Sequence, residues 1–255
     1  MLRQLIELKD DIVEDRFAST SASLFEGAGL VISEDDEIKE NGNYVQVNTP
    51  YARDLSALIY RLKYISKDQL DYLNKYAFYG RLGEAAKRSL ENSSSGKKSI
   101  FLDVVDEALR FVGKVETIRY FAYGSNMDET QMVERCPSAK MVGVAKLKAC
   151  RFALDSAGVA TVINDQDNLV WGIVWEICGC DIVNLDRYEG IKTLCYKHSF
   201  LQIEGDGWNQ EALIYISNRN MNHGVRRTGY MNKIITAARQ LQFPEDYIAS
   251  LACLK

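Results

Sequence analysis

The residues with the clearest chemical potential lie between Tyr123 and Asn126, in the sequence Tyr-Gly-Ser-Asn. Glycine tolerates positive φ, and serine and asparagine side chains hydrogen-bond their own backbone, so we expect a sharp turn there. Asp128 is suited to cap a helix that begins near Glu129 and ends before Pro137. A tight loop before a helix leaves unpaired backbone N–H groups, which can bind a carboxylate or a developing oxyanion. Alone, the pattern is more typical of an ordinary strand-to-helix turn.

The elements around this loop read as a mixture of strands and helices. Residues 118–122 are β-branched and aromatic, as in a buried strand. Similar patterns predict strands at Lys140–Leu154, Gly158–Ile163, Leu169–Ile177, Thr193–Ile203 and Gln210–Ser217. Mixed strands with inserted helices indicate an α+β fold with a partly closed sheet.

Other residues in the second half of the chain predict helices and turns. Asp181 is placed to cap a short helix over Ile182–Tyr188, and Gly190 suits the left-handed position after it. Gly205-Asp206-Gly207 predicts a hairpin turn. Two further helices are expected, Tyr230–Gln240 and one opened by Pro244.

The first 115 residues read as a separate, mostly helical unit of unknown role, followed by a second domain over 116–255. Apolar residues at three- and four-residue spacing predict helices over 2–14, 55–65 and 100–112, and helix formers suggest others at 68–79 and 84–90. Residues 34–43 look like an irregular connection, and 92–98 are the best linker candidate. This unit shows no catalytic constellation.

Composition limits the choice of partners. The chain has 255 residues and a formal net charge of −4, without a long basic run, so nucleic acid is a poor candidate. The apolar runs are too short to span a bilayer, and Met1–Leu5 does not open a secretory signal, so no membrane partner is expected. The six cysteines lack CxxC spacing, which favours reduced thiols and a cytoplasmic protein. A homodimer is left open.

Several stretches, in order, resemble γ-glutamyl cyclotransferases. They are the loop Tyr120–Asn126, the double-tryptophan strand Val170–Trp175, Leu185-Asp186 followed by Glu189-Gly190, the helix that carries Tyr230, and Phe243–Tyr247. The resemblance covers about residues 118–253. It implies a small mixed β-barrel with surrounding helices, no metal or other cofactor, and a small-molecule γ-glutamyl substrate.

The resemblance implies an intramolecular acyl transfer. The α-amine of the substrate attacks its own γ-carbonyl, closes the ring of 5-oxoproline and expels a free amino acid or amine. Glu189 would be the general acid and base, with its pKa raised by an apolar surround. The substrate-binding residues it implies are Tyr120, Phe121, Ala122, Tyr123, Gly124, Ser125, Asn126 and Tyr230.

Each of these roles has a structural alternative. Without the resemblance Glu189 would read as a surface residue at a helix end, and Tyr230 could equally be a core aromatic. Tyr196 could orient the Glu189 carboxylate, although packing is at least as good an explanation. His198 and His223 have no evident Ser or Cys partner, and Cys195 reads as a small buried filler, which disfavours a Cys–His or Ser–His hydrolase.

Three functions are therefore compared. The first is a cyclotransferase of γ-glutamyl amino acids. The second is a specialised form that acts on γ-glutamylamines or a carrier-linked γ-glutamyl group, which the unmatched helical half favours. The third is a non-catalytic binding protein on the same fold, which retention of both the loop and Glu189 disfavours.

Overall fold

The computed structural model describes residues 1–17, 30–32, 45–47, 51–70, 75–92, 96–221 and 227–254. The expected connection at 34–43, residues 93–95 of the linker expected at 92–98, and His223 lie outside these ranges. The chain divides into two compact units, Met1–Glu116 and Thr117–Lys255.

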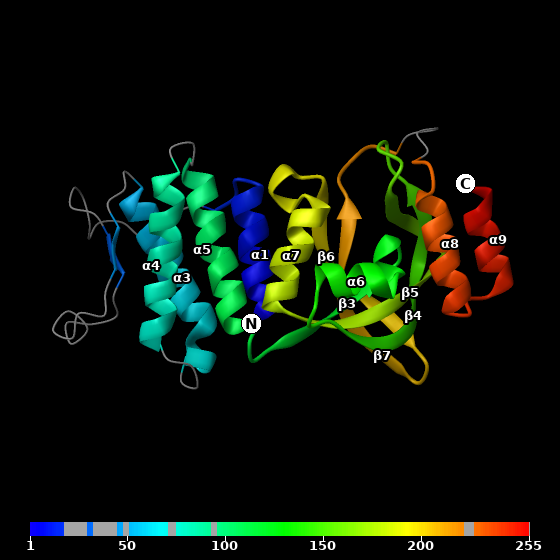
Figure 1. The fold of residues 1–255 in the computed structure, drawn as a ribbon, viewed down its shortest axis with the longest axis horizontal. Coiled ribbons are helices and arrows are strands. Elements are labelled where there is room, and N and C mark those ends of the chain that lie inside the picture. Colours follow the sequence, from blue (N-terminus) through cyan, green and yellow to red (C-terminus); the bar gives the residue numbers. More distant parts are fainter. Residues whose placement is uncertain are drawn as a thin grey trace. The chain divides into compact units, whose positions relative to one another are not determined.

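Helices dominate the described part of the first unit (Figure 1). They are α1 (Leu2–Val13), α3 (Ala52–Leu70), α4 (Lys75–Glu91) and α5 (Lys97–Val112). A short antiparallel pair, β1 (Leu30–Ile32) and β2 (Val45–Val47), was not expected. The helix expected over 68–79 is wrong in its bounds, because α3 continues to Leu70 and α4 begins at Lys75.

Helix α5 is the centre of this unit and packs against α1, α3 and α4. Apolar side chains such as Leu5, Val105 and Leu109 are inaccessible to solvent. The buried Lys9 ammonium of α1 lies 2.5 Å from the Asp106 carboxylate of α5. Removal of one member of such a pair leaves an uncompensated buried charge, so the pair fixes how these two helices meet.

The second unit is a closed five-stranded barrel in the order β3-β5-β4-β6-β7 (Figure 1). Its strands are β3 (Thr117–Ala122), β4 (Lys140–Leu154), β5 (Ala160–Cys178), β6 (Tyr196–Gly205) and β7 (Trp208–Ser217). Antiparallel pairing joins most neighbours, and a parallel contact between Tyr120 and Leu213 closes the barrel. The expected α+β fold with a small mixed barrel is confirmed.

The long pair β4–β5 bends to build much of this barrel. Register shifts at Met141/Gly143 and Lys148/Cys150 mark irregularities that let a strand curve. Gly172 permits a close approach to β3, because a Cβ there would lie 2.5 Å from the carbonyl oxygen of Ala122. Trp175 is buried, and its indole N–H donates to the Asn126 carbonyl oxygen at 3.1 Å, which ties β5 to the loop after β3.

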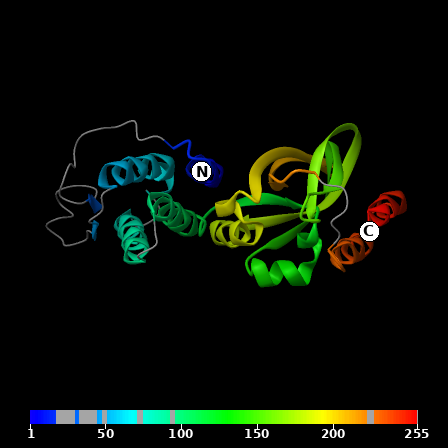
Figure 2. The ribbon, with the colours of Figure 1, turned by 90° about the horizontal axis from the view of Figure 1, so that it is seen from above.

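Local signals predicted several boundaries. Asp128 caps α6 (Glu129–Arg135) by accepting the Gln131 N–H at 2.8 Å. Gly190, at φ 66°, ends α7 (Gly179–Glu189), and Asp206-Gly207 joins β6 to β7. Helix α8 (Tyr230–Gln240) has the expected bounds. Helix α9 (Glu245–Cys253) follows Pro244 and lies beside α8 at one side of the barrel (Figure 2).

Three local predictions were wrong. The strands expected at 158–163 and 169–177 are one strand, β5, because β4 pairs with both segments. Asp181 is not the N-cap of α7 but lies two residues inside it, where its carboxylate accepts the Cys178 N–H at 3.1 Å. The strand expected from Thr193 begins at Tyr196, because Ile191–Thr193 forms a 3₁₀ turn.

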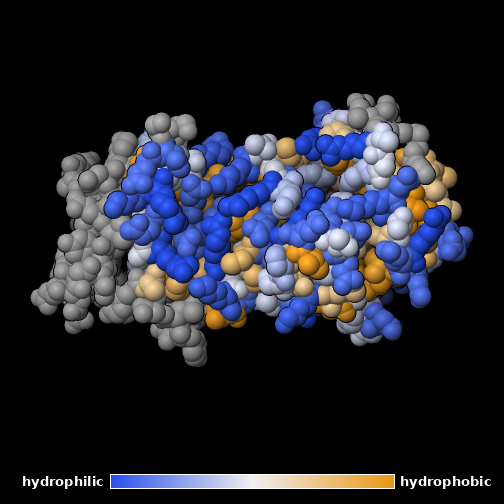
Figure 3. All heavy atoms as spheres, viewed as in Figure 1, coloured by the Kyte–Doolittle hydropathy of each residue, from blue (hydrophilic) through white to orange (hydrophobic). Residues whose placement is uncertain are grey.

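On the face drawn in Figure 3, hydrophobic residues form small separate patches among hydrophilic ones. Within the described ranges, every helix is too short or too polar to cross a membrane.

Candidate active site

The loop after β3 forms one wall of a pocket. The chain leaves β3 through Tyr123 and Gly124 and enters a 3₁₀ turn over Ser125–Met127. This turn pairs the N–H of Met127 with the carbonyl of Gly124 at 3.0 Å. The N–H groups of Ser125 and Asn126 open the turn and find no acceptor among the described residues. They can therefore bind an oxygen that carries negative charge.

Glu189 faces the pocket from the end of α7. The left-handed Gly190 turns the chain immediately after it and so leaves this side chain at the helix end. The side chain is 15% exposed. Burial raises the pKa of Glu189, a shift that Arg135 and the Asn126 hydrogen bond oppose and Asp186 reinforces. A carboxylate with a raised pKa is better matched to proton transfer near neutral pH than a surface glutamate.

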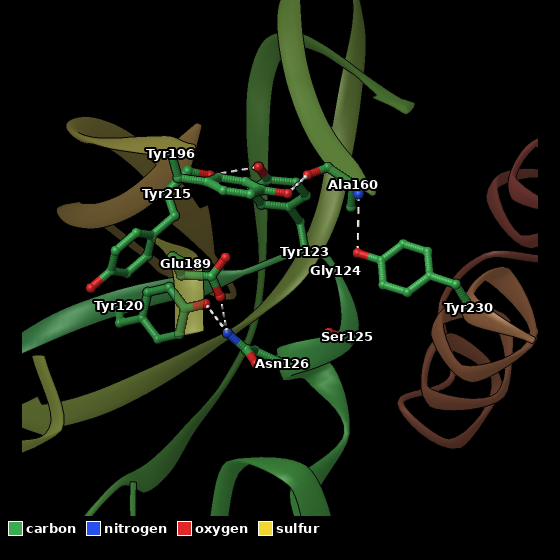
Figure 4. Close-up of a pocket in the computed structure, with 10 residues that line it drawn as sticks. All are labelled: Tyr120, Tyr123, Gly124, Ser125, Asn126, Ala160, Glu189, Tyr196, Tyr215 and Tyr230. Atoms are coloured by element: carbon green, nitrogen blue, oxygen red, sulfur yellow. Dashed lines mark hydrogen bonds between the residues drawn. The ribbon is translucent and has the colours of Figure 1, made fainter. Parts of the chain in front are cut away.

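Asn126 connects the loop to Glu189 (Figure 4). Its Nδ2 donates to Glu189 Oε1 at 3.1 Å and to the Tyr120 hydroxyl at 2.8 Å. Its Oδ1 accepts from Arg135 Nη1 at 2.7 Å and from Gln131 Nε2 at 2.9 Å. Arginine can only donate, so the oxygen of the amide must face Arg135 and its nitrogen must face Glu189. Asn126 therefore holds the carboxylate in place.

Tyrosines line most of the remaining wall. The pocket encloses about 320 Å³, its open mouth included, and is lined by Tyr120, Tyr123, Gly124, Ser125, Asn126, Ala160, Glu189, Tyr196, Tyr215 and Tyr230. Burial raises the pKa of each of these phenols, and that of Tyr230 to about 12. They stay protonated at neutral pH and act as hydrogen-bonding groups rather than bases.

Strand β5 fixes two of these phenols through one residue, Ala160. The Tyr196 hydroxyl donates to the Ala160 carbonyl at 2.7 Å. The Ala160 N–H donates to the Tyr230 hydroxyl at 3.0 Å, which brings the first residue of α8 to the pocket. Tyr123 is held separately, by donation to the Tyr215 carbonyl at 2.6 Å. The pocket is thus pre-formed by bonds to backbone groups.

A buried carboxylate supports the pocket from behind. Asp186 Oδ1 accepts the Tyr215 hydroxyl at 2.6 Å and lies 2.8 Å from His198 Nε2. Both His198 and Asp186 are buried. His198 therefore fixes the wall behind Tyr215 and is not placed as a base for a serine or cysteine. Cys195 is half-buried beside Thr193, with 3.3 Å between Sγ and Oγ1.

The structure brings together most of the residues implied by the resemblance. Tyr120, Tyr123–Asn126, Glu189 and Tyr230 all line the pocket. Phe121 and Ala122 are buried in β3 and do not line it. Tyr196 lies in the pocket but bonds Ala160, and Asn126 orients Glu189 in its place. Sequence reasoning missed Arg135, Ala160 and Tyr215, whose positions carry no local signal.

Among the described residues, no three His, Cys, Asp or Glu side chains gather in a group that could hold a metal ion.

A family model and a solved structure indicate the class of protein to which this fold belongs. The family model of the AIG2-like family matches residues 169–251. A solved structure entitled "Gamma-glutamyl cyclotransferase" superposes with a TM-score of 0.52 at 24% identity, over 55% of this chain and 89% of that chain. At this identity the likeness shows the fold, a barrel of the same kind.

Proteins of similar sequence then identify the family. A mouse protein named "Gamma-glutamylcyclotransferase" is 37% identical over 153 residues, which are 55% of this chain and 80% of the relative. The human protein of the same name is 32% identical over 91 residues, 32% of this chain and 48% of that protein. This chain belongs to the gamma-glutamylcyclotransferase family.

Proposed function

We propose that the second unit catalyses cyclisation of γ-glutamyl compounds to 5-oxoproline. The nitrogen of the substrate's α-amine bonds to its γ-carbonyl carbon, and the bond from that carbon to the leaving amine breaks. The α-ammonium loses two protons as it becomes the lactam N–H, and the amide nitrogen gains two as it leaves as an ammonium group, so the reaction is an intramolecular cyclisation with cleavage that needs no external reactant. The single supporting observation is a half-buried carboxylate, Glu189, that faces the Tyr123–Asn126 loop across one pocket.

Glu189 is proposed to carry the proton. As a carboxylate it takes a proton from the α-ammonium, and as an acid it returns a proton to the leaving amine. Its raised pKa serves both half-steps, because at neutral pH its two protonation states are closer in free energy than those of a surface glutamate. The hydrogen bond from Asn126 Nδ2 leaves Oε2 of the carboxylate available to the substrate.

The loop is proposed to bind an anionic oxygen of the substrate through the Ser125 and Asn126 N–H groups and the Ser125 hydroxyl. This oxygen is either the α-carboxylate or the oxyanion of the tetrahedral intermediate, and kinetics separate the two. If it is the oxyanion, loss of one donor lowers kcat by about 10²–10³-fold. If it is the α-carboxylate, the same change raises KM, because the contact is equal in ground and transition states.

The tyrosine wall is proposed to fold the substrate onto itself. Its phenol rings are rigid and fixed by backbone contacts, so a bound glutamyl chain is held curled inside them. Holding the amine near the carbonyl can supply about 7 kcal/mol of the barrier at the low end of effective-molarity estimates.

The test is to incubate the full chain with a γ-glutamyl dipeptide and to measure the release of 5-oxoproline by chromatography. Glu189→Gln and Glu189→Ala are each expected to lower kcat by about 10²–10⁴-fold. Glu134→Gln is the matched control, because Glu134 is exposed on α6 and lines no part of the pocket. Activity that survives both Glu189 substitutions would refute its role. Ligand-stabilised melting without any product would indicate a binding protein instead.

A further inference from the structure

A second hollow continues outward from the pocket. It shares Ser125, Glu189, Tyr196 and Tyr230 with the inner pocket and encloses about 880 Å³, open solvent included. We call this outer hollow the vestibule. If the glutamyl part of a substrate occupies the inner pocket, with its γ-carbonyl near Glu189, the leaving amine must extend into the vestibule.

Basic side chains outnumber acidic ones in the described lining of the vestibule. Its described lining includes four cations: Arg135 of α6, Arg219 after β7, Arg227 before α8 and Lys233 of α8. Glu189 is the one carboxylate among its described lining residues. By contrast, no Lys or Arg belongs to the described lining of the inner pocket. Since the whole chain has a net charge of −4, this concentration of positive charge is local.

Three of the four cations already have protein partners. Arg135 binds Asn126 Oδ1 at 2.7 Å and stacks on the Tyr188 ring. Arg219 lies 3.2 Å from the inaccessible carboxylate of Asp155. Lys233 Nζ donates to Gln131 Oε1 at 2.8 Å.

Arg227 differs from these three. Its side chain is exposed, and it has no hydrogen bond or ion pair with any other described residue. Its backbone is fixed, because its carbonyl accepts the N–H of Tyr230 at 3.1 Å, three residues along. A guanidinium presents a planar fork of donors that matches a carboxylate with two parallel bonds. Among the described residues that line the vestibule, Arg227 is therefore the cation that is available to a ligand.

We infer that the vestibule selects leaving amino acids that carry a negative side chain, and that Arg227 is a specificity-determining residue. This inference rests on the proposed function and goes further, because it ranks the leaving groups. A γ-glutamyl dipeptide that releases an acidic amino acid is preferred to one that releases its neutral isostere. A γ-glutamylamine whose released amine carries no carboxylate is a poorer substrate still, because it offers Arg227 no negative charge.

The test compares γ-glutamylglutamate with γ-glutamylglutamine, which differ by one charge and almost nothing in shape. We expect kcat/KM to favour the acidic dipeptide by about fivefold at low salt, the upper range of an exposed ion pair. The preference should shrink as ionic strength rises, since the Debye length falls from about 30 Å at 0.01 M to about 8 Å at 0.15 M. Arg227→Gln should lower the ratio about threefold or more.

Arg239→Gln is the matched control. It removes the same charge from an exposed position of α8 that does not line the vestibule, and it should leave the ratio unchanged. Equal kcat/KM values for the two dipeptides, or a ratio that Arg227→Gln leaves intact, overturn the inference while the proposed function stands.

A binding measurement keeps the inference testable without turnover. Calorimetry of both dipeptides on the Glu189→Gln variant should show the same preference, and its loss when Arg227→Gln is added. If no dipeptide yields 5-oxoproline, the proposed function fails, and these affinities alone decide whether the vestibule selects anions. Equal affinities would overturn the inference.

Discussion

Replacement of Asn126 by aspartate tests the link between the loop and the acid. The two side chains have the same shape, so the contacts of Oδ1 with Arg135 and Gln131 can persist. The Nδ2 that donates to Glu189 at 3.1 Å becomes a carboxylate oxygen at the same place. A stabilising hydrogen bond is thus exchanged for a repulsion between two carboxylates, and the repulsion disfavours ionised Glu189.

The size of the effect follows from the geometry. Two charges about 4 Å apart repel by about 4 kcal/mol at an effective dielectric constant of about 20. That corresponds to an increase of about 3 units in pKa, since one unit is about 1.4 kcal/mol. Arg135, which is 2.7 Å from Asn126 Oδ1, offsets part of the repulsion. We expect the pKa of Glu189 to rise by at least about one unit.

The assay is kcat/KM for 5-oxoproline release as a function of pH. If Glu189 must be ionised to accept the proton, the rising limb of the profile moves to higher pH in Asn126→Asp. Asn209→Asp places the same new charge at an exposed position of β7 that lines neither the pocket nor the vestibule, and it should leave the limb in place. A folded Asn126→Asp enzyme with an unmoved limb would show that Glu189 does not set the profile.

Two further changes test the electrostatics and the wall of the site. Burial raises the pKa of Glu189 in the folded state above its value in the unfolded state. The contribution of Glu189 to stability is therefore complete below the unfolded-state pKa and is lost as the pH rises through the folded-state pKa. Glu189→Gln should therefore melt higher than the wild type at neutral pH, with a difference that disappears in acid; calorimetry that finds no pH dependence would contradict this. Tyr230→Phe removes the acceptor of the Ala160 N–H, so it should lower the free energy of unfolding by about 1–3 kcal/mol and raise KM. Denaturant-induced unfolding at an unchanged midpoint would mean that water replaces the phenol.

Local chemistry predicted a large part of the barrel unit. The end of β3, the cap at Asp128, the left-handed Gly190 and the Asp206-Gly207 hairpin each depend on the conformational preferences of a few neighbouring residues, so short sequences carry the information. The bounds of α8 follow for the same reason, from one apolar face repeated along eleven residues. These signals already place Glu189 at a helix end and Ser125 in the turn that precedes a helix.

The tertiary structure alone decided what these ends face. Residues 158–163 and 169–177 form one strand because β4 extends alongside both, and pairing between distant segments leaves no local mark. Closure of the barrel brings Tyr215 of β7 and Ala160 of β5 to the loop after β3, and α6 adds Arg135. The resemblance named Asn126 for the substrate, but only the side-chain packing shows that its amide is held between Arg135 and Glu189. The sequence by itself determined the individual elements, and the closed barrel determined the pocket, because a site is made of side chains that only long-range pairing brings together.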